Sequence, residues 1–256
     1  MNESATPSVY PIRLEGELDP PLSRWLWLMK WVLAIPHFFV LFFLWIAFLV
    51  VGVIAFFGIL FTGRYPRSLF DFNVGVLRWS WRVHYYGYWA LGTDRYPPFT
   101  LAEVPDYPAH LDVPYPERLS RGLIFVKWFL AIPHYVVLAV FVGGGVWLGT
   151  RGGDANDGWD NGLNAGWSLV GLLVLIAAIM LLFTGRYPKP LYDFVMGMDR
   201  WALRVAAYTA LMTDRYPPFR LDQGGTDPSW VPTGPIPPSP SGVPTGAPPA
   251  PPVPAR

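Results

Sequence analysis

The sequence predicts an all-α integral membrane protein built as a tandem repeat, in which a transmembrane helical hairpin is followed by an amphipathic interfacial helix. The first observation is composition: the 256 residues are 52% hydrophobic and 14% charged, whereas soluble domains average roughly 45–50% apolar and 25% charged residues. The second is the presence of long uncharged stretches, which are typical of membrane spans. The third is a polar unit that occurs twice, at residues 62–99 and 184–219.

The chain begins with a polar segment, residues 1–21, and continues into the first repeat, residues 22–110. The polar segment lacks the basic start of a secretory signal, so we expect no cleavable signal. Between residues 22 and 61, helical residues would extend for about 60 Å, twice the ~30 Å hydrocarbon core. This stretch must therefore bend. Pro36 is the expected break, because proline removes a helical hydrogen bond.

Two arrangements of the first repeat remain open. If it starts and ends on the same side of the membrane, residues 22–61 form two spans of about twenty residues each, and the protein has four spans. If residues 22–35 instead lie flat in the interface, one tilted span covers residues 36–61, and the protein has three spans.

The second repeat, residues 111–222, copies the membrane part as well as the polar part. The segment KWVLAIPHF at residues 30–38 recurs as KWFLAIPHY at residues 127–135. The distance between matching residues grows from 97 to 122 along the chain, which places 25 extra residues in the second copy.

These extra residues predict a hairpin in the second copy. Their centre, residues 150–162, is rich in Gly, Asp and Asn and predicts a solvent-exposed loop. The apolar stretches on either side, residues 122–148 and 163–183, are each long enough to cross a membrane. The loop holds one Arg and three Asp, whereas its flanks are basic. Basic flanks favour the cytoplasm, so we expect both termini of the chain to be cytoplasmic.

The last segment, residues 223–256, has a composition that cannot build a core. Twelve prolines lie between residues 228 and 254, together with Gly, Ser and Thr. We expect a disordered tail, which is either a plain spacer or a polyproline segment that docks on a partner.

The repeated polar unit predicts a helix at about residues 68–91, after a Gly-Arg-Tyr-Pro helix stop. At 100° per residue, one acidic and two basic side chains fall on one stripe of this helix. They are Asp71, Arg78 and Arg82 in the first copy and Asp193, Arg200 and Arg204 in the second. The opposite face is apolar, as in helices that lie in the membrane interface.

Two interpretations of this stripe remain open. The arginines could clamp a lipid phosphate, because a guanidinium can bond two oxygens at once. They could equally staple helices together through Asp71 and Asp193. The unit ends in a strap with the sequence Thr-Asp-Arg-Tyr-Pro-Pro-Phe, at residues 93–99 and 213–219. We expect Asp94 and Asp214 to bond nearby backbone or the other copy.

Two pairs of ionisable residues fall within the apolar stretches. They are Lys30 with His37 and Lys127 with His134. Ionisable residues inside a membrane are functional candidates, for example in a proton path. The simpler interpretation is that each lysine snorkels to the interface and each histidine bonds a carbonyl released by the adjacent proline.

Several classes of function are not indicated. A net charge of +1 gives no case for nucleic acid binding. The absence of cysteine excludes disulfides and thiolate chemistry. No nucleophile elbow, phosphate loop or zinc signature occurs, so we expect neither enzymatic activity nor a cofactor or bound metal.

Three segments carry a family resemblance: LSRWLWLMKWVLAIPHF, TGRYPRSLFDFNVGVLRWSWRV and GTDRYPPFTLAEVPDYP. Over about residues 10–221 the chain resembles the bacterial membrane proteins grouped as domain-of-unknown-function family 4389. The resemblance implies a multi-pass protein of the bacterial inner membrane with a duplicated domain, and it supplies no activity, ligand or site residue.

The function expected from the sequence is non-enzymatic. The chain would bind lipid headgroups, or another membrane protein, through the duplicated arginine-bearing helix. The alternative is a small transporter or channel with the Lys and His pairs in its pathway. The oligomeric state is not predicted.

Overall fold

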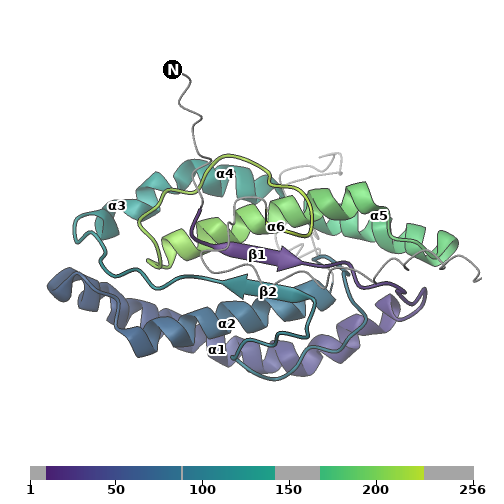
Figure 1. Cartoon of the computed structure of the whole chain (residues 1–256), viewed down its shortest axis with the longest axis horizontal. Helices are drawn as coiled ribbons and strands as arrows, with labels where there is room; N and C mark the ends of the chain where they lie inside the picture. The colour runs from purple at the N-terminus through teal and green to yellow at the C-terminus, as the bar shows by residue number, and fades with distance from the viewer. Residues whose placement is uncertain (1–9, 88, 142–167, 228–256) are drawn as a thin grey trace, which may run out of the picture.

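The computed structural model describes residues 10–87, 89–141 and 168–227 (Figure 1). Its elements are β1 (Arg13–Gly16), α1 (Trp27–Thr62), α2 (Arg67–Tyr86), β2 (Ala109–Asp112), α3 (Leu123–Leu130), α4 (Ile132–Phe141), α5 (Leu169–Thr184) and α6 (Lys189–Thr209). The described chain is thus mostly helical, as predicted. The all-α prediction is wrong in one respect, because β1 and β2 form a two-stranded sheet.

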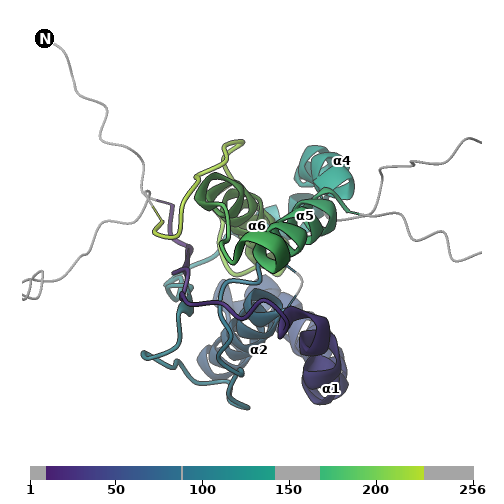
Figure 2. The ribbon, with the colours of Figure 1, turned by 90° about the vertical axis from the view of Figure 1, so that its right-hand side faces the viewer.

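The elements are arranged in layers that run along the long axis of the molecule. Figure 2, viewed along this axis, shows the strands on one side, α2 and α6 in the middle, and α1 with α4 on the other side. The first copy occupies one half and the second copy the other half (Figures 1 and 2).

The long helix α1 is continuous, so the predicted split of residues 22–61 into two spans is wrong. Its buried residues recur at intervals of three, four or seven positions and form one narrow stripe: Lys30, Ala34, His37, Leu41, Phe48, Ala55 and Ile59. The rest of its surface is apolar and open, with Phe39 67% and Leu49 65% exposed. Among the described helices, α1 alone is long and apolar enough to cross a membrane; the apolar segments 123–139 and 169–184 are shorter.

The two matching prolines have different effects. Pro133 ends the α3 segment, since α3 stops at Leu130 and α4 starts at Ile132. Pro36 lies inside α1 without ending it. The strap contacts α1 close to this proline, because the Tyr96 hydroxyl donates to Leu33 O at 3.1 Å.

The amphipathic helix α2 is covered on both faces, which contradicts its predicted place on the membrane surface. Its apolar face packs on α1, where Trp79 and Val83 contact Leu41. Its other face is covered by the chain that follows it: a Cβ atom on Gly75 would lie 2.8 Å from the Cβ of Leu101. The apolar face of α2 is therefore used within the protein.

The two strands relate the copies by an approximate two-fold axis. They pair antiparallel with Leu14 opposite Leu111, and these two leucines are 97 residues apart, the distance that separates the first halves of the copies. The sequences YPIRLE and YPAHLD, which start at Tyr10 and Tyr107, are the signal that sequence reasoning missed. Symmetric pairing of matching residues indicates that β1 and β2 are equivalent parts of the two copies.

The two strand segments pack against different copies, each through a tyrosine that bonds to a strap. The Tyr107 hydroxyl donates to Arg95 O, and the Tyr10 hydroxyl donates to Arg215 O, both at 3.2 Å. The segment with β2 thus follows the first copy along the chain and packs against the strap of that copy. The segment with β1 precedes the first copy along the chain but packs against the strap of the second copy.

Some predictions fall on residues outside the described ranges. These are the loop at 150–162, the connection 142–167 that contains it, and the tail from residue 228. Residues 223–227, which the sequence assigned to the tail, are described and have defined contacts.

Candidate functional site

The duplicated lysines and histidines lie in a cluster that we call the clasp, one in each copy. The first clasp consists of Lys30, His37, Trp79, Asp94 and Phe99, and the second of Lys127, His134, Trp201, Asp214 and Phe219. Each clasp joins the apolar helical segment of its copy, α1 in the first and α3 with α4 in the second, to the amphipathic helix and the strap of that copy.

In both clasps the lysine is buried and paired with the aspartate of the strap. Lys30 Nζ lies 2.9 Å from Asp94 Oδ1 and donates to Thr93 O at 2.7 Å. Lys127 Nζ lies 2.7 Å from Asp214 Oδ1 and makes the matching backbone bond at 2.8 Å. The predicted snorkelling of these lysines is therefore wrong, because the strap provides an acidic partner inside the protein.

The strap aspartates bond nearby backbone, as predicted. Asp94 Oδ2 accepts from the backbone N–H of Ser23 at 2.5 Å. Asp214 Oδ2 accepts from that of Ser120 at 2.6 Å. Each carboxylate thereby connects the start of an apolar helix to the end of the polar unit.

Aromatic side chains of the amphipathic helix and the strap hold the histidines. His37 Nδ1 accepts a hydrogen bond from the Trp79 indole N–H at 3.1 Å, and its ring stacks on Phe99 with centroids 3.9 Å apart. The second clasp repeats these contacts at 3.1 Å with Trp201 and 4.0 Å with Phe219. The predicted bond from each histidine to the carbonyl freed by the adjacent proline is wrong, because Nδ1 of each ring accepts from a tryptophan and Nε2 makes no hydrogen bond to that carbonyl.

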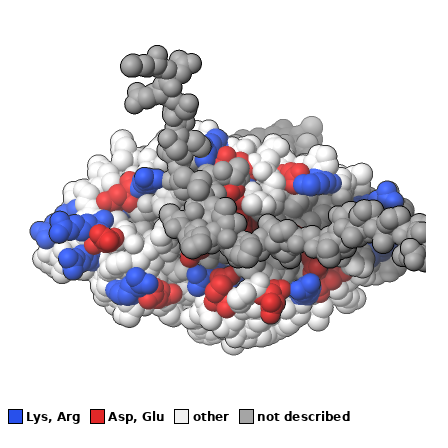
Figure 3. Space-filling model, in the orientation of Figure 1, with Lys and Arg blue, Asp and Glu red and all other residues white. Residues whose placement is uncertain are grey.

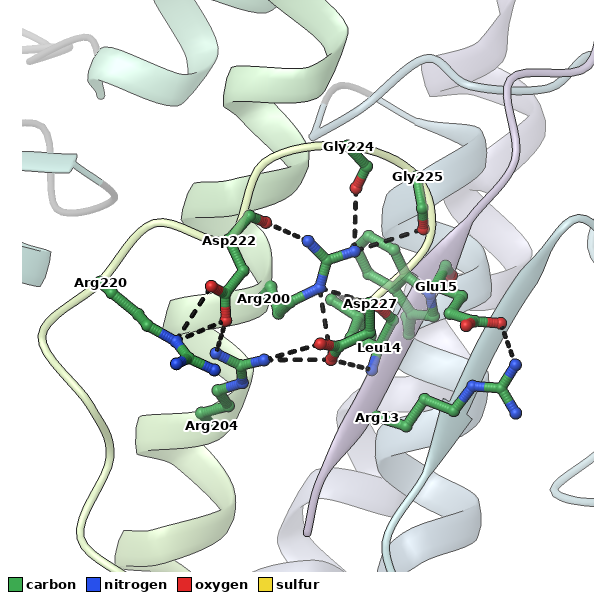
Figure 4. Close-up of polar contacts among 11 residues, drawn as sticks. Arg13, Leu14, Glu15, Arg200, Arg204, Arg220, Asp222, Gly224, Gly225 and Asp227 are labelled. Atoms are coloured by element: carbon green, nitrogen blue, oxygen red, sulfur yellow. Dashed lines mark hydrogen bonds and ion pairs between the residues drawn. The ribbon is translucent and has the colours of Figure 1, made fainter. Parts of the chain in front are cut away.

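Arg200 of α6 lies at the centre of a buried network (Figure 4). It donates to Leu14 O at 3.0 Å, to Gly224 O at 2.9 Å and to Gly225 O at 3.3 Å. Its Nε lies 3.4 Å from Asp227, which is also buried. Burial lowers the pKa of the Arg200 guanidinium, and the Asp227 carboxylate opposes that shift. The network fastens β1 and residues 222–227 to α6.

Arg204 completes this network one helical turn later. It contacts Asp222 at 2.5 Å and Asp227 at 2.9 Å. Asp222 also pairs with Arg220 at 3.0 Å on the outer edge, as Figure 4 shows. Both arginines of the second stripe therefore have carboxylate and carbonyl partners within the chain.

The arginines of the first copy make similar bonds, but the Arg78 pair is more exposed to solvent than the Arg200 pair. Arg78 donates to Leu111 O at 3.0 Å, which matches the Arg200 bond to Leu14. Arg78 also pairs with Glu103 at 2.6 Å. Arg82 is buried and donates to Ala102 O at 2.8 Å and to the Thr100 carbonyl.

The acidic members of the stripe stand apart from these arginines. Asp71 pairs with Arg67 at 3.1 Å, and Asp193 pairs with Lys189 at 2.8 Å. Both are neighbours four residues apart on the helix, the spacing at which side chains meet most readily. The interpretation in which Asp71 and Asp193 staple the helices is wrong, although the arginines do fasten the fold through other partners.

Asp199 is a buried acid that sequence reasoning missed. It is 1% exposed, and neither carboxylate oxygen has a hydrogen-bond partner among the described residues. Burial raises the pKa of Asp199 well above its ordinary value. The first copy has Leu77 at the matching position, 122 residues earlier. That difference between otherwise matching helices is the signal that could have found it.

We predict that Asp199→Asn stabilises the protein, increasingly so as pH rises. The native state holds the proton more tightly than the unfolded state, whose pKa is near the ordinary value of 3.8. Stability conferred by the protonated acid is therefore lost as pH rises from about 4 toward the native pKa, at about 1.36 kcal/mol per pH unit. Unfolding temperatures of both proteins, measured in mild detergent at pH 5 and pH 8, should show a gap that widens at pH 8.

Asp193→Asn is the matched control on the same helix. Asp193 forms a surface pair with Lys189, and such pairs contribute about 0–1 kcal/mol. The prediction would be contradicted if the difference in unfolding temperature between Asp199→Asn and the parent were the same at pH 5 and at pH 8.

A cavity of about 520 Å³ lies between the two copies. Its walls come from α1 in the first copy, including Phe48 and Val53, and from the second copy, including Trp128 and Leu211. The lining is predominantly apolar, so the cavity fits a hydrocarbon group better than a polar substrate.

The ends of two apolar helices form what we call the basic corners. The first corner consists of Phe61, Arg64 and Arg121, and the second of Phe183, Arg186 and Arg24. The phenylalanines are 72% and 78% exposed. Each corner combines a helix end from one copy with an arginine from the other.

Glycine makes this approach possible. Gly63 and Gly185 end α1 and α5 with φ of 71° and 70°, in the left-handed region. A Cβ atom on Gly63 would lie 3.5 Å from Arg121 Nε, and one on Gly185 would lie 2.7 Å from Arg24 Nη2. The negative end of each helix dipole also favours a cation here.

The described residues contain no group of three or more His, Cys, Asp or Glu side chains that could hold a metal ion. The site candidates are therefore the clasps, the arginine networks, the cavity and the basic corners.

Comparison with known proteins identifies a family and no characterised relative. No curated protein and no solved structure matches the chain. The family described as "Domain of unknown function (DUF4389)" matches residues 24–100 and 163–220, together more than half of the chain. The first range lies within the first copy, and the second range lies within the later part of the second copy. The chain therefore belongs to the DUF4389 family.

Proposed function

We propose that the protein is a non-enzymatic membrane protein that binds phosphate-bearing lipid headgroups at its two basic corners. The observation that supports this best is the pairing, at each corner, of exposed arginines with an exposed phenylalanine at the end of an apolar helix. A phenylalanine in acyl chains with an arginine beside it places the guanidinium at the level of the lipid phosphates.

The position of this site differs from the one expected from the sequence. The stripe arginines have partners inside the chain, and Arg82, Arg200 and Arg204 are at most 1% exposed. The corner arginines are exposed. A guanidinium that is open to solvent can donate hydrogen bonds to two oxygens of a phosphate without first losing an internal partner.

The membrane that we propose is the bacterial inner membrane, with the basic corners on its cytoplasmic side. Arg118 adds a further exposed positive charge near the first corner, and Lys189 near the second. An excess of Lys and Arg next to apolar segments favours the cytoplasmic face. Anionic headgroups there would be attracted by the same charges.

No contact in the described residues favours the alternative of a small transporter or channel. Lys30 and Lys127 are each bonded to the strap of their own copy. His37 and His134 are each covered by a phenylalanine of that strap. The lysines and histidines thus have a structural role, because they attach the strap of each copy to its apolar helices.

The headgroup proposal predicts a selective loss of anionic lipid. We expect the variant with Arg24, Arg64, Arg121 and Arg186 all changed to Gln to retain several-fold less phosphatidylglycerol than the parent, with unchanged phosphatidylcholine. The measurement is lipid analysis after purification from an equimolar mixture in mild detergent. Arg95→Gln is the control, since Arg95 is exposed on the strap. Equal retention by the four-site variant and the parent would overturn the proposal.

A further inference from the structure

On one side of the molecule, charged side chains lie along the whole length of α2, which packs on α1. The helix α2 returns along α1, so that its residues Trp79 and Tyr86 reach His37 and Lys30. The 20 residues of α2 extend about 30 Å, which equals the hydrocarbon thickness of a bilayer. If α1 stood upright in a membrane, α2 and the chain segments that cover it would therefore extend through the entire hydrocarbon core.

The outer face of α2 and the chain that covers it together carry exposed charges from one end of α2 to the other. The side chains of Arg67 and Asp71 are 67% and 56% exposed at one end of α2. The side chain of Asp112 is 66% exposed near its middle, and that of Arg95 is 59% exposed near the other end. Figure 3 shows acidic and basic groups distributed over this face. Charges at every depth of the hydrocarbon would make an upright orientation very costly.

The opposite side of the molecule is apolar over the same length. Besides α1, the helices α3, α4 and α5 expose large apolar side chains, with Phe129 70%, Val136 64% and Ile179 44% exposed. Figure 2 places α1 and α4 on the side away from the strands. Soluble proteins rarely expose a contiguous apolar surface of this extent. The boundary between apolar and polar surface thus runs parallel to α1.

We propose that α1, α3, α4 and α5 lie flat within one leaflet of the membrane, with the strands in water. This rests on the proposed membrane function and names the surface that contacts lipid. The 36 residues of α1 measure about 54 Å, so an upright α1 would greatly exceed a ~30 Å core. In the flat orientation α1 needs no break, and α2 and α6 lie between the acyl chains and the water. The cavity between the copies is then occupied by an acyl chain of that leaflet.

The natural absence of cysteine allows a direct test. Four single-cysteine variants of the full chain are needed: Ser23→Cys before α1, Leu49→Cys in its middle, Ser68→Cys after it, and Asp106→Cys on the polar side. Each is treated with a membrane-impermeant maleimide in right-side-out and in inverted membrane vesicles. A lipid-soluble maleimide serves as the control for reactivity.

We expect positions 23, 68 and 106 to react from the same side of the membrane, at least tenfold more than from the other side. Position 49 should react with the lipid-soluble reagent only. Reaction of positions 23 and 68 from opposite sides would show that α1 crosses, and reaction of position 49 from the side opposite position 23 would show a hairpin. Either result would overturn the flat orientation.

The test separates this inference from the headgroup proposal. Release of the protein from the vesicles by alkaline carbonate would overturn membrane insertion and the flat orientation with it. Same-side labelling together with unchanged phosphatidylglycerol retention in the four-arginine variant would support the flat orientation and overturn only the headgroup site.

Discussion

Arg200→Met is expected to destabilise the protein by about 3–5 kcal/mol, the cost of removing one member of a buried ionic network. Arg200 is fully buried and donates to the carbonyls of Leu14, Gly224 and Gly225. Without it the Leu14 and Gly224 oxygens lose this donor, Gly225 O keeps only its bond from Gly16 N–H, and a cation disappears beside the buried Asp227. The segment with β1 would also lose one of its attachments to α6, while the Tyr192 hydroxyl of α6 still donates to Gly16 O at 2.7 Å. The unfolding temperature in mild detergent, followed by tryptophan fluorescence, measures the loss.

Arg78→Met is the matched control, because Arg78 occupies the same place in the first copy. Its side chain is 18% exposed, and its partner Glu103 is 37% exposed. Water can therefore solvate the carboxylate that remains, and we expect a loss of about 1 kcal/mol, near the upper end for surface pairs. Equal losses for the two variants would contradict the role assigned to burial.

Lys127→Met is expected to cost about 3 kcal/mol, the lower part of the range for breaking a buried pair. The Lys127 side chain is 0% exposed, while that of Asp214 is 31% exposed, so water recovers part of the loss. The variant also removes the bond from Lys127 to Thr213 O, one of the contacts that hold the strap. The same unfolding measurement applies. Increased proteolysis near residue 213 would locate the damage.

Lys189→Met is the control for this second prediction. Lys189 also pairs with an aspartate, Asp193 at 2.8 Å, but its side chain is 75% exposed. The same substitution at a surface pair should change stability by about 0–0.5 kcal/mol. If Lys127→Met were no more damaging than Lys189→Met, the clasp would not contribute to stability.

The parts of the fold that depend on local chemistry could be predicted from the sequence. Gly63 and Gly185 end helices because glycine accepts positive φ and the following proline prevents continuation. The helical register of α2 and α6 follows from the spacing of their apolar residues. Charge and proline content alone identified the duplicated strap, and the predicted backbone bonds of Asp94 and Asp214 are confirmed.

The partners of the charged residues could not be predicted, because they come from distant parts of the chain. The sequence grouped Asp71 with Arg78 by helical angle, yet each found a closer partner, Arg67 four residues away and Glu103 on the following segment. The bond between Arg200 and Leu14 joins residues 186 positions apart. No local pattern specifies such a pair.

By itself the sequence determined that this protein is duplicated, mostly helical and rich in uninterrupted apolar surface, since repetition, periodicity and composition are properties of the chain. Only the tertiary structure decided what the repeated polar unit does. Burial removes water from Arg82, Arg200 and Arg204, and a buried guanidinium must bond whatever carbonyls and carboxylates the fold brings to it. The arginines left at the helix ends remain exposed. Among the described elements, the same layering placed α1 and α4 on the side of the molecule away from the strands.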